Sequence, residues 1–212
     1  NKESIFSYLA FSYIPEPQTI YQNIFKLEAG SQLLIKGRHL EKKKYWALRP
    51  TSGKLDSLPG VTSTLDALIS TSVQKHMISD VPVGLMLSGG LDSSALLSYA
   101  SKLQSEQKIK TFTINFEGKV GKDASFASLV SNMFDTEHHV LDISFSDQVL
   151  ALDELIDRLD EPIADSALIP TYLISKAARS MGIKVLLTGA GGDEIFGGYA
   201  RHFSGIFGSA SW

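Results

Sequence analysis

Residues 83–94 have the sequence Val-Gly-Leu-Met-Leu-Ser-Gly-Gly-Leu-Asp-Ser-Ser and decide the fold of this 212-residue chain. The stretch opens on an apolar run, and a helix-like segment, Ala-Leu-Leu-Ser-Tyr-Ala, follows it directly at 95–100. A glycine-rich turn between a buried strand and a helix start presents backbone N–H groups at the positive end of the helix dipole. The stretch therefore predicts a strand, an anion-binding loop and a helix.

The residue types in this loop suit a polyphosphate. Gly89 and Gly90 lack a Cβ, so the backbone can turn sharply and come close to phosphate oxygens. Further hydrogen-bond donors come from the hydroxyl groups of Ser88, Ser93 and Ser94. A carboxylate at Asp92 repels phosphate unless a divalent cation lies between them, so we expect Asp92 to hold Mg2+. The alternative is a serine- and glycine-rich turn that only caps the helix.

The loop pattern Ser-Gly-Gly-x-Asp-Ser resembles the pyrophosphate-binding loop of the N-type ATP pyrophosphatases. The surrounding sequence is similar to the synthetase domain of glutamine-hydrolysing asparagine synthetases. Segments in that family's order and spacing are Leu-Asp-Glu-Pro at 159–162, Ile-Pro-Thr-Tyr-Leu at 169–173 and Lys-Val-Leu-Leu-Thr-Gly-Ala-Gly-Gly-Asp-Glu-Ile-Phe-Gly-Gly-Tyr at 184–199. The resemblance implies an α/β fold: a doubly wound parallel sheet of the ATP pyrophosphatase (adenine nucleotide alpha hydrolase-like) type, preceded by a remnant of a β-rich glutaminase domain.

Hydrophobic periodicity independently predicts alternating strands and helices. We expect strands at 83–87, 109–116, 138–143 and 185–187, and helices at 65–76, 95–100, 126–134, 150–159 and 167–181. This alternation is typical of a parallel sheet covered on both faces. Nearer the N-terminus we expect a helix over 5–13 and a hairpin between strands at 33–35 and 42–46, with lysines 42–44 on a solvated edge.

These segments suggest three parts. Residues 1–48 are expected to be the C-terminal remnant of the glutaminase domain, 49–60 a linker rich in glycine, serine and proline, and 61–212 the synthetase domain. The family continues with a helical region that supplies a phosphate-binding lysine, so we expect the chain to be truncated. An exposed apolar patch would then comprise Phe203, Ile206, Phe207 and Trp212.

Composition fits an ordinary soluble domain, with 43% apolar residues, 20% charged residues and a net charge of −3. Nothing in it indicates a nucleic acid partner, a membrane span or a signal peptide. The chain has no cysteine, which excludes disulfides, thiolate metal sites and the cysteine nucleophile of the family's glutaminase. We expect a cytoplasmic protein that binds small molecules, and the sequence leaves a homodimer open.

Ligands of such sheets bind at the carboxyl ends of the strands. By resemblance, the AMP pocket is lined by Met86, Leu87, Ile114, Thr188 and Gly189, and the pyrophosphate loop comprises Ser88, Gly89, Gly90, Leu91, Asp92, Ser93 and Ser94. Asp193 is expected to face Asp92 as a second Mg2+ ligand. Glu194 is either a further catalytic carboxylate or a brace for the loop. Candidate substrate contacts are Asp165 and Ser166. Plain core packing remains an alternative for Met86 and Ile114.

The resemblance implies that a carboxylate, aspartate in the asparagine synthetases, attacks the α-phosphate of ATP. Ammonia from glutamine then displaces AMP, giving asparagine, AMP and pyrophosphate. Ala190 departs from the family, because relatives usually carry a proton-accepting side chain there and a methyl group cannot take a proton. The alternatives are a homologue that binds Mg-ATP but is impaired or uses another carboxylate, and a ring-closing enzyme with the same loop. His138 and His139 alternate on a strand, and we assign neither to the site.

Overall fold

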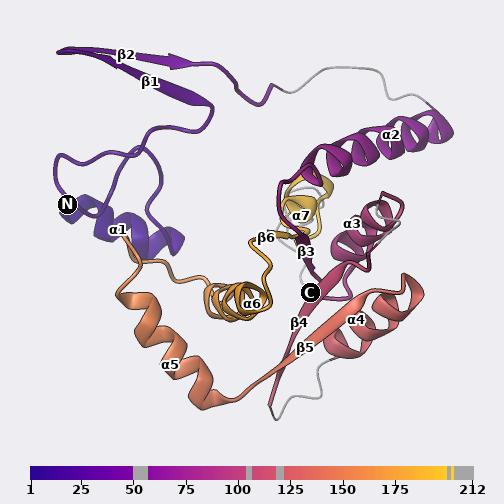
Figure 1. Cartoon of the computed structure of the whole chain (residues 1–212). Coiled ribbons are helices and arrows are strands. Elements are labelled where there is room, and N and C mark those ends of the chain that lie inside the picture. Colours follow the sequence, from indigo (N-terminus) through magenta and orange to yellow (C-terminus); the bar gives the residue numbers. More distant parts are fainter. Residues whose placement is uncertain (50–56, 104–106, 118–121, 200–201, 203–212) are drawn as a thin grey trace, which may run out of the picture. The chain divides into compact units, whose positions relative to one another are not determined.

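The computed structural model describes residues 1–49, 57–103, 107–117, 122–199 and 202, and Figure 1 shows their helices and strands. The chain divides into two compact units. Unit 1 comprises Asn1–Leu55 and Asp153–Leu168, and unit 2 comprises Asp56–Leu152 and Ile169–Trp212. Among the described residues, no helix has both the length and the apolar character needed to cross a membrane.

Unit 2 is built on a parallel sheet. In its described part the sheet contains β3 (Val83–Met86), β4 (Lys110–Phe116), β5 (Glu137–Ile143) and β6 (Val185–Leu187), in the order β5-β4-β3-β6. The chain therefore starts at β3, moves outward to β4 and β5, and returns to pair β6 with the other side of β3. This reversal is the switch point of a doubly wound sheet, where such folds open a crevice for ligands. The predicted fold class is confirmed.

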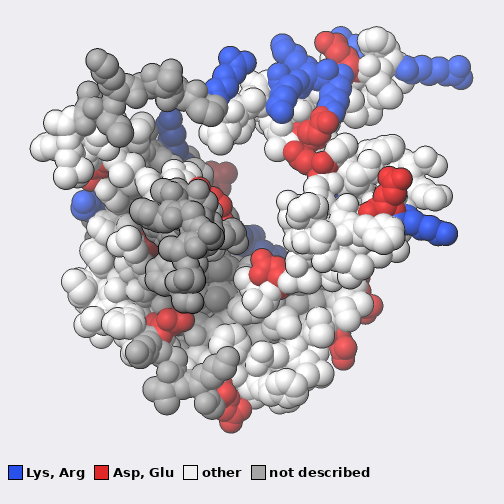
Figure 2. Space-filling view, turned by 180° about the vertical axis from the view of Figure 1, so that it is seen from behind, with Lys and Arg blue, Asp and Glu red and all other residues white. Residues whose placement is uncertain are grey.

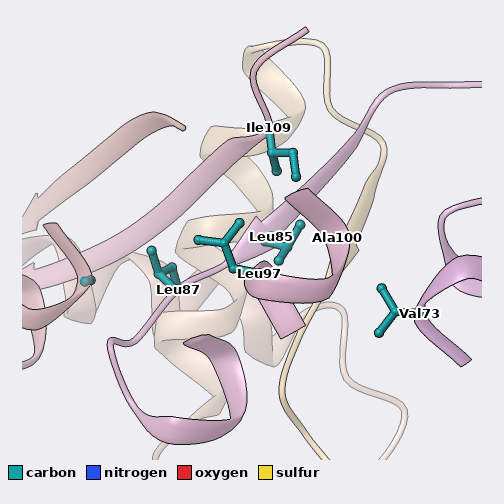
Figure 3. Packing of buried hydrophobic residues seen from close by; sticks show 7 residues of the cluster. Val73, Leu85, Leu87, Leu97, Ala100 and Ile109 are labelled. Carbon is teal, nitrogen blue, oxygen red and sulfur yellow. The ribbon is translucent and has the colours of Figure 1, made fainter. Parts of the chain in front are cut away.

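Helices cover both faces of this sheet. Because side chains alternate along a strand, Leu85 and Leu87 point to one face and Met86 points to the other. The first face packs against α2 (Leu58–His76), α3 (Leu91–Ser101) and α4 (Lys122–Met133) through a cluster of Val73, Leu85, Leu87, Leu97, Ala100, Ile109 and Ala127. Figure 3 shows Leu97 of α3 close to Leu85 of β3.

The opposite face packs against α6 (Leu168–Ser180). Its cluster consists of Phe112, Ile174, Ala178 and Ile183, with Met86, Ile114, Leu141 and Leu186 partly buried against it. Between β5 and α6 runs α5 (Phe145–Ile156), and after β6 the short α7 spans Gly192–Phe196. Burial on both faces is what a parallel sheet requires.

Unit 1 contains α1 (Lys2–Phe11) and an antiparallel hairpin of β1 (Ser31–Lys36) and β2 (His39–Lys44). The hairpin is confirmed, but its return strand begins at His39, ahead of the predicted 42–46, because the turn has only two residues and pairs His39 with Lys36. The expected solvated edge is also confirmed: lysines 42–44 are exposed, and Lys42 pairs with Glu28. Figure 2 shows basic side chains gathered on this hairpin.

Glu161 ties the two segments of unit 1 together. Its Oε1 accepts a hydrogen bond from the Ile20 N–H at 3.0 Å, and its Oε2 lies 2.5 Å from Lys26 Nζ. The Ala164 N–H donates to the Ser12 carbonyl at 2.9 Å. The expected boundaries at residues 48 and 60 remain predictions, since most of the expected linker lies outside the described residues. The expected apolar patch of Phe203, Ile206, Phe207 and Trp212 lies outside them as well.

Candidate functional site

A cavity of about 650 Å³ lies at the carboxyl ends of β3 and β6, beside β4. This volume is typical of sites for small-molecule ligands. Expected site residues that line it are Met86, Leu87, Ser88, Gly90, Leu91, Asp92, Ser93, Ile114, Thr188, Gly189, Asp193 and Glu194. Ala190 also lines the cavity. The structure therefore gathers, in one place, segments that lie about a hundred residues apart.

Four expected site residues are not part of this lining. Gly89 packs against α4, and the Ser94 N–H donates to the Gly90 carbonyl at 3.1 Å in the first turn of α3. Asp165 and Ser166 belong to unit 1, and their contact with a substrate remains a prediction. The Asp165 carboxylate accepts a hydrogen bond from the Ala167 N–H at 2.8 Å, which braces the chain just before α6.

The loop after β3 is held by its own serines. Ser88 Oγ lies 3.0 Å from Ser93 Oγ and accepts a hydrogen bond from the Gly90 N–H at 3.3 Å. Ser93 Oγ donates to the Gly90 carbonyl at 3.2 Å. These bonds fix the turn that begins α3. The two hydroxyls thus have a structural role, and the donor role toward a phosphate that the sequence predicts for them stays a prediction.

Gly89 is required by both conformation and space. Its φ of +76° lies in the left-handed region that side chains disfavour. A Cβ built at Gly89 would lie 2.5 Å from the backbone N of Ala127 and 2.6 Å from the Phe126 Cβ, both on α4. The loop can take this course against α4 only because residue 89 has no side chain.

Asp92 lies beneath the segment that follows β6. A Cβ at Gly189 would lie 2.9 Å from the Asp92 Cβ, and a Cβ at Gly192 would overlap the Asp92 carboxylate. Glycine at both positions lets the backbone between β6 and α7 rest directly on the first turn of α3. The structure thus brings together the two glycine-rich motifs that the sequence predicts to converge.

Asp193 and Glu194 occupy the first turn of α7. The Asp193 carbonyl accepts hydrogen bonds from the Gly197 and Gly198 N–H groups at 2.9 and 3.1 Å, which turns the chain back on itself. Glu194 Oε1 accepts a hydrogen bond from the Tyr199 hydroxyl at 2.9 Å. Within the described residues, the Tyr199 hydroxyl therefore orients the Glu194 carboxylate.

Apolar side chains form another part of the cavity lining. Met86 and Ile114 line the cavity while also packing against the core cluster of α6, so the lining and core interpretations of these residues both hold. Phe112 and Ile174 from that cluster contribute to the same part of the lining. Apolar side chains and the start of a helix in the same cavity suit a ligand with an aromatic ring and a phosphate chain.

Carboxylates from three helices line the cavity, namely Asp92, Asp123, Asp193 and Glu194. Among the described residues, no group of three or more acidic, histidine or cysteine side chains is arranged to hold a metal ion alone. Mg2+ needs only one or two protein carboxylates when phosphate oxygens and waters complete its shell. These donors therefore fit a Mg2+ ion that arrives with a polyphosphate.

The sequence did not single out several lining residues. Asp123, Phe196 and Tyr199 line the cavity, and Asp123 comes from the first turn of α4. Tyr199 ends the Gly-Gly-Tyr segment that carried the resemblance, and that segment could have identified Tyr199 as a site residue. Asp123 reaches the cavity through the packing of α4 against the loop after β3, which spacing along the chain does not predict.

The two histidines of β5 lie outside the lining, as expected. His138 Nδ1 is 2.8 Å from Thr111 Oγ1, and its Nε2 is buried with no hydrogen-bond partner among the described residues. Burial lowers the pKa of His138 below its usual value, and the neighbouring His139 lowers it further. His139 stacks on Phe112 with ring centroids 5.2 Å apart.

The fold and cavity define an α/β protein with a glycine- and serine-rich loop that lines a cavity at the switch point of its sheet. A family model described as asparagine synthase matches residues 64–211, and the chain belongs to that family. It is 38% identical over 211 residues to a putative glutamine-hydrolysing asparagine synthetase 2 of Methanocaldococcus jannaschii, covering 97% of this chain and 40% of the relative. It is 35% identical to asparagine synthetase 1 of Bacillus subtilis, covering 94% of this chain and 31% of the relative. The chain thus spans less than half the length of either relative.

Two solved structures show weaker similarity. One is the NH3-dependent NAD synthetase of Campylobacter jejuni, with 16% identity, a TM-score of 0.44, and coverage of 68% of this chain and 62% of that chain. The other is the U34-tRNA thiolase NcsA of Methanococcus maripaludis, with 18% identity, a TM-score of 0.45, and coverage of 68% and 54%.

Proposed function

We propose that the cavity binds ATP with Mg2+, transfers AMP to a carboxylate, and forms an amide when an amine displaces the AMP. The observation that carries this proposal is the position of Asp92, which lies beneath Gly192 at the helix start that follows the Ser-Gly-Gly loop. A loop of N–H donors and carboxylates that suit Mg2+ line the same cavity. Membership in the asparagine synthase family supports the same chemistry.

In this proposal the adenine lies against Met86 and Ile114, with Thr188 and Gly189 at its edge. The N–H groups at the start of α3 hold the pyrophosphate, whose departure they favour by stabilising its charge. Asp92 and Asp193 would hold Mg2+, which when bound neutralises the phosphates so that an anionic carboxylate can approach. Catalysis then rests mainly on positioning and charge neutralisation.

We propose aspartate as the carboxylate and ammonia released from glutamine as the amine, giving asparagine. The relatives that the chain resembles are named glutamine-hydrolysing asparagine synthetases, which supports this choice. Ala190 on the cavity wall favours a second candidate, a homologue that binds Mg-ATP but acts on another carboxylate or has lost the amide step. A cytoplasmic location belongs to the same proposal.

The test is aspartate-dependent exchange of labelled pyrophosphate into ATP by the intact protein. We expect exchange that requires aspartate and Mg2+, and a loss on the order of 100-fold in Asp92→Asn, because the metal ligand is gone. The matched control is Asp153→Asn, an exposed carboxylate of α5 outside the lining, which should keep full exchange. Binding of Mg-ATP without exchange would contradict aspartate as the substrate and favour the second candidate.

A further inference from the structure

The amide step of the proposed function needs a group that accepts a proton, and the following inference rests on that proposed function. When the amine nitrogen attacks the acyl-adenylate, a C–N bond forms and the C–O bond to AMP breaks, with its electron pair leaving on the phosphate oxygen. The nitrogen must then lose one proton. Ala190 on the cavity wall cannot take it, and transfer to another positioned side chain would be faster than transfer to water.

The lining offers four carboxylates for this task. Asp92 and Asp193 are the proposed Mg2+ ligands, and a carboxylate bound to a cation is a poor base. Glu194 directly follows Asp193 in α7, which places it in the turn that covers Asp92. Asp123 comes from a different element, the first turn of α4. Both are candidates by position, and within the described residues Glu194 differs from Asp123 in accepting a hydrogen bond from a tyrosine hydroxyl of its own turn.

Tyr199 is built into this turn to meet Glu194. Gly197 has a φ of +79°, and Gly198 leaves no space for a Cβ because the Asp193 carboxylate lies there. The two glycines reverse the chain after α7 and bring the Tyr199 hydroxyl to 2.9 Å from Glu194 Oε1. On the other side, the His202 ring packs edge-on against the Tyr199 ring with centroids 5.3 Å apart.

We propose that Glu194 accepts the proton from the attacking amine and that Tyr199 is its positioning residue. A glutamate side chain that is free to rotate rarely presents its carboxylate in one direction, and Glu194 is exposed. The Tyr199 hydroxyl donates to one carboxylate oxygen and so fixes the direction of the group at the cavity. The proton passes from the nitrogen to the Glu194 carboxylate and from there to solvent.

The experiment separates adenylation from amide formation in the intact protein, with ammonium salt as the amine source. Pyrophosphate exchange reports adenylation, and amide product reports the second step. We expect Glu194→Gln to lower kcat for amide formation on the order of 100-fold and Tyr199→Phe to lower it about tenfold. In both variants the loss of exchange should be smaller than the loss of amide formation, because the proposed proton transfer belongs to the second step. The double variant should be no slower than Glu194→Gln alone, because the two residues act as one unit.

The matched control is Tyr99→Phe, which removes a similar hydrogen bond from a tyrosine hydroxyl to a carboxylate, Tyr99 to Asp66 at 2.7 Å, away from the lining. It should leave both steps unchanged. Wild-type amide formation in Tyr199→Phe overturns the positioning role. Loss of amide formation in Asp123→Asn but not in Glu194→Gln overturns the choice of base. Absence of exchange in the wild type overturns the proposed function, and this inference with it.

Discussion

At the scale of single residues, glycine is required for two different reasons: a left-handed backbone and a lack of space for a Cβ. Gly89 and Gly182 both have left-handed backbones, with φ values of +76° and +81°, but only Gly89 has neighbours where a Cβ would be. We expect Gly182→Ala to lower the free energy of unfolding by about 1–2 kcal/mol, from backbone strain alone. Gly89→Ala should cost at least about 1 kcal/mol more, because the backbone of α4 must move.

Chemical denaturation of both variants measures this difference. Equal losses would show that α4 yields easily to a side chain at residue 89. ATP titration of the same samples tests the loop, since affinity should fall in Gly89→Ala and stay unchanged in Gly182→Ala.

His138 links stability to pH. Burial holds the pKa of His138 below 6.5 in the folded protein, so between that lowered pKa and 6.5 the unfolded chain binds more protons than the folded one. Stability should therefore rise with pH within this window and be lost as the pH falls below about 6.5. His138→Gln should flatten this slope, whatever it does to the absolute stability.

Urea unfolding midpoints between pH 5 and 8 give the slope. The control is His76→Gln, a change of an exposed histidine on α2, which should keep the wild-type slope. The same slope in His138→Gln and the wild type would contradict the linkage to His138.

The loop residues around Asp92 were predictable one by one, because local chemistry specifies glycine, serine and aspartate at a helix start. Three-dimensional packing alone revealed two other facts. Ser88 and Ser93 hydrogen-bond to each other, and Asp123 reaches the cavity from α4. Neither follows from spacing along the chain, since each depends on the exact course of a neighbouring segment.

At the scale of elements, Gly192 at the contact between α7 and α3 differs from Gly89, because its close neighbour is a side chain. A Cβ at Gly192 would meet the end of the Asp92 side chain, which can swing away, and not a fixed backbone. We expect Gly192→Ala to fold almost normally, with a change in melting temperature of a few degrees at most, but to lose pyrophosphate exchange at least tenfold because Asp92 is displaced. Adding Gly192→Ala to Asp92→Ala should have no further effect. A normal exchange rate in Gly192→Ala would contradict this account.

The packing of α3 on the sheet contributes to the free energy of unfolding of unit 2. Leu97 is fully buried among Leu85 and Leu87, whereas Leu91 on the same helix is 85% exposed. We expect Leu97→Ala to lower the free energy of unfolding by about 2–5 kcal/mol through lost burial and a residual cavity. Leu91→Ala should change it by less than about 0.5 kcal/mol. Comparable losses in a denaturation series would contradict the position of this core.

Strand and helix order was predictable because hydrophobic periodicity reports which side chains are buried. The ends of helices and strands were less predictable. The expected helix over 150–159 ends at Ile156, and the expected helix over 65–76 begins at Leu58, with proline in its first turn. A proline is compatible with a helix start as well as with a linker, so sequence pattern alone cannot separate the two.

At the scale of the whole molecule, unit 1 is discontinuous in sequence, and Glu161 joins its segments. Its side chain is only 15% exposed and contacts both the Ile20 N–H and Lys26. We expect Glu161→Ala to destabilise unit 1 by about 1–3 kcal/mol, because the half-buried Ile20 amide loses its acceptor and the Lys26 ammonium keeps, among the described residues, only the Ile14 carbonyl. Amide hydrogen exchange in residues 1–26 should rise while unit 2 stays protected. Unchanged protection of residues 1–26 would contradict this role.

This association of residues 153–168 with the N-terminal segment was not predictable from the sequence. Glu161 lies in the Leu-Asp-Glu-Pro segment that carried the resemblance, and in the structure its carboxylate is engaged within unit 1. By contrast, the parallel sheet of unit 2 was expected, because strands that alternate with helices favour it, whereas its strand order comes from the structure.

Because β6 lies at one end of the described sheet, the stability of the folded protein would depend on the nucleotide proposed to bind there. It is the shortest of these strands, with three residues, and it carries the loop that covers Asp92. Short end strands open more readily than central ones, so β6 belongs to the least protected part of the sheet. A nucleotide bound between the loops after β3 and β6 would connect β6 to the rest of the sheet. At a concentration 100 times its Kd it would stabilise the folded state by about 2.7 kcal/mol. The lifetime of the folded protein would then follow the supply of its own substrate.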